Sequence, residues 1–119
     1  IHKHSPSREY YFKEGCHILE ILNSDDDTDV SIARARVEPG VRTRTHVLTA
    51  TRERYLILSG TGTVFVGDIE EQVKAGDLVD IPAGCEQAIV NTDTEDLIFL
   101  SICTPRVLLR NYRDTDHAN

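Results

Sequence analysis

The stretch GVRTRTHVLTATRERYLILSG at residues 40–60 predicts a strand, a loop and a second strand. A Pro-Gly turn at 39–40 precedes the first extended run, which carries His46, and Glu53 opens a second run that is apolar and ends in glycine. The stretch GDLVDIPAGCEQAIVN at residues 76–91 repeats this layout, because two turns enclose a short apolar run before another extended segment. The two stretches therefore predict paired strand–turn–strand units.

The rest of the chain favours the same fold class. Residues 16–22 and 97–103 are apolar runs of strand length, and residues 30–38 alternate between small or apolar and charged side chains. No segment keeps an apolar period of three to four for long enough to form a helix, and Gly, Pro and Asp turns separate the runs. Short strands joined in this way predict an all-β fold with a closed or sandwiched antiparallel sheet.

Both stretches resemble the two motifs of the cupin superfamily. Two ligand positions of those motifs depart from the pattern, because Leu48 and Gln87 stand where the motifs carry histidines. The resemblance implies a double-stranded β-helix, the jelly-roll cupin barrel, which in that family often forms a homodimer through its outer strands. The residues in register with the motifs are Gly40, His46, Glu53, Gly60, Gly76, Pro82, Gly84 and Asn91.

The length of 119 residues predicts one domain. We expect residues 1–9 to form a flexible N-terminal arm, residues 10–105 to form the cupin barrel, and residues 106–119 to form a C-terminal tail. Within that tail, residues 107–109 are expected to pack on the outside of the barrel.

Composition limits the partners of the chain. The net charge of −7 disfavours nucleic acid and anionic membranes, because there is no excess of Lys and Arg to neutralise phosphates. No apolar run is long enough to span a bilayer. The three cysteines, Cys16, Cys85 and Cys103, are far apart and form no Cys-x-x-Cys pair, which disfavours a disulfide framework and favours a reducing cytoplasm. A small-molecule ligand is the partner that remains.

The cupin resemblance implies a metal site. Carried over to this sequence, the metal ligands are His46, Glu53 and Gln87, and an imidazole with two oxygen donors suits manganese, iron, nickel or zinc. Three protein ligands would leave coordination positions open for a substrate. The alternative is a pocket without metal, in which His46 and Gln87 hydrogen-bond Glu53.

Four arginines are candidates for binding an anionic substrate. Arg34 and Arg36 share one face of residues 30–38, and they either lie in solvent, which we favour, or point into the barrel mouth. Arg42 and Arg44 share the face of His46 if their strand is unbroken.

Two classes of function remain open. As an enzyme, the chain resembles a metal-dependent cupin of the dioxygenase, decarboxylase, lyase or isomerase type that acts on an oxygen-rich or anionic small molecule. Glu53 and Tyr55, which alternate onto one strand face, are then the candidates for proton transfer. As a binding module, the same barrel would hold a small molecule without turnover, and a fold that hosts many chemistries does not decide between the two.

Overall fold

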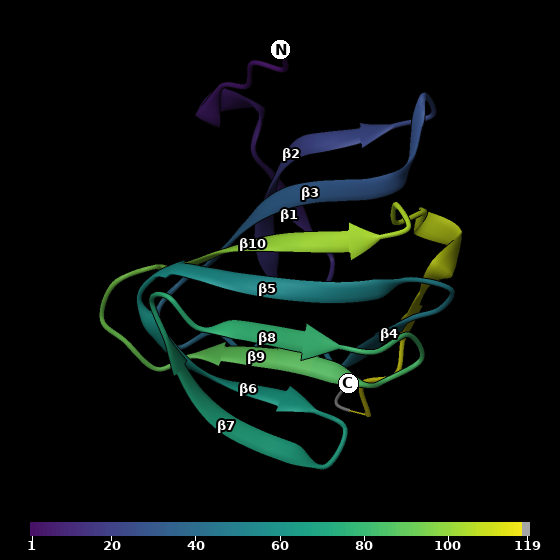
Figure 1. The fold of residues 1–119 in the computed structure, drawn as a ribbon. Coiled ribbons are helices and arrows are strands. Elements are labelled where there is room, and N and C mark those ends of the chain that lie inside the picture. Colours follow the sequence, from purple (N-terminus) through teal and green to yellow (C-terminus); the bar gives the residue numbers. More distant parts are fainter. Residues whose placement is uncertain (118–119) are drawn as a thin grey trace.

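The computed structural model describes residues 1–117, which form two antiparallel sheets (Figure 1). One sheet has six strands in the order β1-β2-β3-β10-β5-β8, and the other has five in the order β11-β4-β9-β6-β7. The strands are β1 (Tyr10–Phe12), β2 (Cys16–Ser24), β3 (Asp27–Val37), β4 (His46–Leu48), β5 (Arg52–Ser59), β6 (Thr61–Val66), β7 (Ile69–Lys74), β8 (Leu78–Ile81), β9 (Gln87–Asn91), β10 (Leu97–Thr104) and β11 (Tyr112–Asp114). Two short 3-10 helices are η1 (Pro6–Arg8) and η2 (Leu109–Asn111).

Strand β10 joins the early and middle parts of the chain. It pairs with β3 on one side and with β5 on the other, so that the last long strand lies between two strands that precede it by many residues (Figure 1). This crossing of sequence-distant strands in two facing sheets is the jelly-roll arrangement. The all-β double-stranded β-helix predicted from the sequence is confirmed.

Alternation along β5 separates the interior from the exterior. Glu53, Tyr55 and Ile57 are buried, whereas the residues between them are only partly buried. This period of two is what a strand with one face in the barrel requires. The same strand therefore supplies the core through Ile57 and a polar interior site through Glu53 and Tyr55.

Two motif residues have clear structural tasks. Gly60 has φ +88°, and a Cβ there would lie 2.8 Å from the Asp96 carbonyl oxygen, so the turn accepts only glycine without rearrangement. Asn91 is 1% exposed and its amide donates to the Val37 and Glu95 carbonyls at 2.9 and 2.8 Å. The side-chain oxygen Oδ1 of Asn91 accepts a hydrogen bond from the Asp93 backbone N–H at 2.8 Å. The glycine and the asparagine of the motifs therefore serve the backbone of the barrel, one by its conformation and the other by its hydrogen bonds.

Both chain ends depart from the expected loose segments. Glu9, placed at the end of the arm, forms ion pairs with Arg34 and Arg36. In the expected tail, β11 pairs with β4, and Val107 lines the interior cavity together with Leu109. The tail was expected on the outside of the barrel, but the Ser31 hydroxyl accepts from the Val107 backbone N–H at 2.9 Å and holds Val107 at the cavity wall. Residues 118–119 of that tail lie outside the described residues.

Within residues 1–117, no helix is both long and apolar enough to cross a membrane.

Candidate functional site

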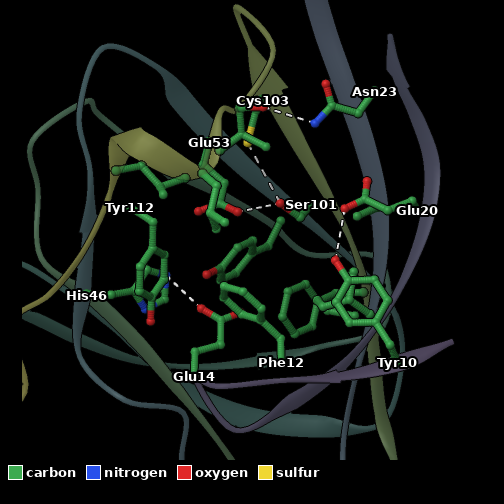
Figure 2. A pocket seen from close by; sticks show the side chains of 18 residues that line it. Tyr10, Phe12, Glu14, Glu20, Asn23, His46, Glu53, Ser101, Cys103 and Tyr112 are labelled. Atoms are coloured by element: carbon green, nitrogen blue, oxygen red, sulfur yellow. Dashed lines mark hydrogen bonds and ion pairs between the residues drawn. The ribbon is translucent and has the colours of Figure 1, made fainter.

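A cavity of about 370 Å³ lies inside the barrel and is lined by eighteen residues from both sheets and both chain ends (Figure 2). Its volume is near the lower end of the range for small-ligand sites. The apolar lining residues are Phe12, Ile18, Ala33, Ala35, Leu48, Phe99, Val107 and Leu109. The lining residues with polar groups are Tyr10, Glu14, Glu20, Asn23, His46, Glu53, Tyr55, Ser101, Cys103 and Tyr112.

His46 and Glu14 form a pair at one end of this cavity. Figure 2 shows the two side chains pointing toward each other, with His46 Nε2 3.1 Å from Glu14 Oε2. The other ring nitrogen, Nδ1, lies 2.9 Å from the backbone carbonyl oxygen of Arg44. Glu14 Oε1 accepts a hydrogen bond from the Cys16 thiol at 2.9 Å. His46 is 3% exposed, so the pair is largely withdrawn from water.

The partners of His46 determine where its protons lie. A carbonyl oxygen can only accept, so Nδ1 of His46 carries a hydrogen that it donates to Arg44. The Nε2–Glu14 contact then needs one more proton, held either by an imidazolium facing a carboxylate or by a carboxylic acid facing a neutral imidazole. In both cases a transferable proton lies between His46 and Glu14 at the cavity wall.

Tyr112 covers this pair from the C-terminal segment. Its ring stacks on the His46 ring with centroids 5.0 Å apart and an interplanar angle of 22°. Lys13 Nζ lies 4.9 Å from the centroid of the Tyr112 ring. The stacked Tyr112 ring and the contacts of both ring nitrogens hold the His46 imidazole in one orientation.

Glu53 is a second buried acid that lines the cavity. The Ser101 hydroxyl donates to Glu53 Oε2, and burial raises the pKa of the Glu53 carboxyl above its ordinary value. The charge of Glu14 adds to that rise in pKa, whereas the Ser101 hydrogen bond and His46 oppose it. A carboxyl with a raised pKa is suited to exchanging protons near neutral pH.

Tyr55 and Gln87 are bonded to each other. The Tyr55 hydroxyl donates to Gln87 Oε1, and burial raises the pKa of Tyr55 well above its ordinary value. Gln87 lies close enough to Glu53 to favour its charged form. However, neither Gln87 Nε2 nor Glu53 Oε1 has a hydrogen-bond partner of acceptable geometry among the described residues. Glu53 lines the cavity, so its free Oε1 is available to a ligand, whereas Gln87 is not among the lining residues.

The three predicted metal ligands come together but do not fit a metal ion in this arrangement. His46 and Gln87 are directly opposite on β4 and β9, yet both ring nitrogens of His46 face oxygen acceptors. The Gln87 oxygen accepts from Tyr55, and Leu48 lines the cavity without offering a donor. Within residues 1–117, no three His, Cys, Asp or Glu side chains form a metal-binding group. The atoms of His46 and Gln87 that would bind a metal ion are used in hydrogen bonds instead.

None of the four predicted arginines is among the residues that line the cavity in the described part of the chain. On β3 the small alanines 33 and 35 face the cavity, and Arg34 and Arg36 on the opposite face bond Glu9. Arg42 and Arg44 do not share a strand face with His46, because β4 begins only at His46. Arg44 bonds Asp114 at 2.6 Å, and Arg42 lies 4.9 Å from the Phe65 ring in an outer groove.

The cavity is consequently acidic. Three carboxyl groups line it, from Glu14, Glu20 and Glu53, whereas no Lys or Arg of residues 1–117 does so. Apart from His46 beside Glu14, no cationic side chain of the described residues lines the cavity, so the carboxyl groups disfavour an anionic ligand. The site therefore suits a neutral ligand, or a cationic one, better than the anion expected from the arginines.

Sequence reasoning missed several residues of this site. Glu14 and Tyr112 lie outside the two motifs, and nothing in their local sequence indicates that they meet His46. Ser101 is different, because it alternates with Phe99 and Cys103 on β10, and all three line the cavity. A strand-alternation argument applied to β10 would have placed Ser101 inside the barrel.

Comparison with known proteins identifies the fold family of the central part of the chain. The cupin domain family matches residues 33–103. A search of curated proteins found no match.

Solved structures with the same fold cover nearly the whole chain. Streptomyces Pac13, described as a nucleoside dehydratase, is 15% identical over 100% of this chain and 94% of its own, with a TM-score of 0.82. A predicted oxalate decarboxylase from Thermotoga maritima is 26% identical over 78% of this chain and 81% of its own, with a TM-score of 0.70. A Klebsiella pneumoniae protein with a double-stranded β-helix domain is 19% identical over 91% of this chain and 90% of its own, with a TM-score of 0.75.

Proposed function

The chain belongs to the cupin family, and we propose that it is an enzyme that transfers protons on a neutral small molecule through His46 and Glu14. The observation that carries this proposal is the placement of His46, whose two ring nitrogens both face oxygen acceptors. A proton shared at the wall of a cavity that a small molecule can enter is what a general acid requires.

A second group is needed to complete proton transfer. Glu53 is the candidate, because it lines the same cavity and its Oε1 has no partner among the described residues. As a carboxylate it would take a proton from carbon, while the His46–Glu14 pair gives one to a departing or carbonyl oxygen. Proton removal with loss of a hydroxyl group as water is a lyase reaction, and proton removal with return at another atom is an isomerase reaction. Tyr55 then acts by positioning Gln87 rather than as the acid or base.

The ligand class follows from the charge and shape of the cavity. An anion such as a dicarboxylate would meet three carboxyl groups, whereas a neutral molecule with a flat ring could contact the aromatic lining residues Phe12 and Phe99. Pac13 has been solved with uridine, a ligand of this kind. Its 15% identity supports only the fold likeness, so uridine serves here as the first probe of a neutral, hydroxylated class.

A metal-dependent reaction is the competing proposal. Manganese, iron, nickel or zinc bound by His46, Glu53 and Gln87 would require His46 to release Glu14 and Gln87 to release Tyr55. We favour acid–base chemistry because those hydrogen bonds already use the donor atoms.

The test compares the metal-stripped wild-type protein with two metal-stripped variants, each of which removes one member of the His46–Glu14 pair. Neutral nucleosides, sugars and hydroxyketones are incubated with the protein in D₂O and EDTA, and NMR detects deuterium uptake or loss of water. His46→Gln and Glu14→Gln should each lower the rate about 100-fold or more, whereas Glu71→Gln on the exposed strand β7 should leave it unchanged. Turnover that appears only with added metal would replace this proposal with the metal-dependent one. Binding without turnover of any compound would indicate a binding module.

We also propose that two copies associate through the outer face of the six-stranded sheet. Leu100, Leu56 and Leu78 are aligned there across β10, β5 and β8, and Leu78 is 59% exposed. Leu78→Asp should convert a dimer to a monomer in light scattering, and a wild-type monomer would refute this proposal. The three free thiols agree with the reducing cytoplasm proposed as the location.

A further inference from the structure

The end of the cavity away from His46 carries a second polar pair, Tyr10 and Glu20. Figure 2 shows them on the opposite side of the cavity from His46 and Tyr112. The Tyr10 hydroxyl donates to Glu20 Oε1 at 3.1 Å. Burial raises the pKa of Tyr10 to about 12, with a contribution from Glu20, so the hydroxyl keeps its proton and acts as the donor.

Glu20 keeps most of its capacity to accept hydrogen bonds. A carboxylate has about four acceptor positions, of which Tyr10 occupies one. Within residues 1–117, no other side chain or backbone group donates to Glu20. The pKa of Cys103 on the cavity wall is raised to about 12 by burial, then by the charge of Glu53 and, to a smaller extent, by the charge of Glu20.

The wall beside Glu20 leaves room for a ligand group. Ala33 is the cross-strand neighbour of Glu20, and Ala35 is the neighbour of Ile18, so the adjacent strand contributes only methyl groups. No Lys or Arg from the described residues lines the cavity to neutralise this carboxylate. Glu20 is exposed at this open end of the cavity, so its remaining acceptor positions can be reached by water or by the hydroxyl groups of a ligand that enters there.

We propose that Glu20 is the specificity-determining residue of the cavity and that it binds a cis vicinal diol. Two adjacent hydroxyl groups on one side of a sugar ring can donate to both carboxylate oxygens together, and such charge-assisted hydrogen bonds are stronger than neutral ones. Acidic residues recognise ribose hydroxyls in this manner in dinucleotide-binding proteins. The assignment rests on the proposed function, because it takes the ligand to be neutral and hydroxylated.

The position of Glu20 also orients the ligand. With the diol held between Tyr10 and Glu20, the rest of the molecule extends past Phe12 and Phe99 toward His46. The hydroxylated end is thus bound for recognition, and the other end reaches the proton-transfer pair. A phosphate group on the ligand would meet the negative charge of Glu20 and would weaken binding.

The test uses three probes that differ only at the sugar. Calorimetry measures the affinity of the full-length protein for uridine, 2′-deoxyuridine and arabinofuranosyluracil, which has a trans diol with the same number of hydroxyl groups. Wild type should bind uridine about tenfold or more tightly than the other two probes. Glu20→Gln should lose this preference by weakening uridine alone, and Tyr10→Phe should reduce it in part. Glu71→Gln, which removes the same charge on exposed β7, should leave all three affinities unchanged.

The outcomes separate this inference from the proposed function. Equal binding of the three probes to wild type, or a uridine preference that survives in Glu20→Gln, would overturn the diol assignment and leave the acid–base proposal standing. If none of the three probes binds, the proposed ligand class is wrong and the diol assignment is wrong with it.

Discussion

The motif-bearing part of the chain, residues 33–103, and the segments that flank it contribute differently to the cavity. The central part supplies the barrel and the buried groups Glu53, Tyr55 and Gln87, which are bonded within the barrel. The flanking segments supply Glu14 and Tyr112, which fix the proton and the orientation of His46. In this chain the fold is thus specified by the motifs, whereas the chemistry depends on residues that the motifs do not contain.

The largest expected effect is on metal affinity, and it comes from restoring the two histidines that the cupin motifs carry at positions 48 and 87. The double substitution Leu48→His and Gln87→His adds two imidazoles to His46 and Glu53, because Leu48 lines the cavity and Gln87 is opposite His46. We expect zinc or nickel to bind about 1000-fold more tightly than to wild type, measured by chelator competition.

A matched control adds the same two imidazoles but places one of them outside the cavity. In Val47→His with Gln87→His, residue 47 alternates to the other face of β4, so only the substitution at residue 87 can add a ligand and the gain should be smaller. If both double variants bind metal equally, the central part does not hold a preformed metal geometry.

The next largest effect compares two asparagines, one in each part of the molecule. Asn91 is 1% exposed and bonds three backbone groups, so Asn91→Ala leaves buried polar groups unsatisfied and should lower the free energy of unfolding by about 3 kcal/mol. Asn23 is exposed and tethers Val107 at 3.0 Å. Asn23→Ala should cost less than about 1 kcal/mol in the same urea titration. Equal losses would show that the flanking segment is part of the cooperative core.

The fold could be predicted from the motifs because several motif residues are required by the conformation or the hydrogen bonds of the backbone. Gly60 is needed at a positive φ against Asp96, and Asn91 binds backbone groups that any barrel of this kind must satisfy. The alternation of β5 likewise placed Glu53 and Tyr55 on one interior face. These relations are local or repeat at fixed spacing, so a single sequence reveals them.

The site was less predictable because its partners are distant in sequence. Glu14 meets His46 across 32 positions (46 minus 14), and Tyr112 comes from a segment expected to be a tail. The arginines on both sides of the first motif suggested an anion, but Arg36 pairs with Glu9 and Arg44 pairs with Asp114, which are acidic residues of the chain ends. Pairing between distant side chains depends on tertiary packing, which spacing within a motif does not encode.

A smaller effect concerns Glu53, whose burial lowers the free energy of unfolding at neutral pH. Because burial raises the pKa of Glu53, the folded state binds its proton more tightly than the unfolded state, and stability falls as the pH rises above the ordinary carboxyl value. Glu53→Gln removes that dependence and should raise the free energy of unfolding at pH 7 by about 1–2 kcal/mol. Urea titrations between pH 5 and about 8 should show a difference that grows with pH and then becomes constant. A variant less stable than wild type at every pH would contradict this account.

The smallest effect tests how the N-terminal segment is held. The hydrogen bond from Arg36 is the main cause that lowers the pKa of Glu9, and Arg34 contributes, so this contact stabilises the folded state above the ordinary carboxyl pKa and is lost as the pH falls through the lowered value. Glu9→Gln should increase hydrogen exchange of the Tyr11 and Phe12 amides only a few-fold at neutral pH, because partly exposed ion pairs are weak. The difference from wild type should persist at the ordinary carboxyl pKa and disappear only at lower pH, once Glu9 in wild type is protonated. Glu70→Gln on exposed β7 should change neither amide. A difference that persists in acid would mean that packing, rather than the charge of Glu9, holds this segment over the cavity.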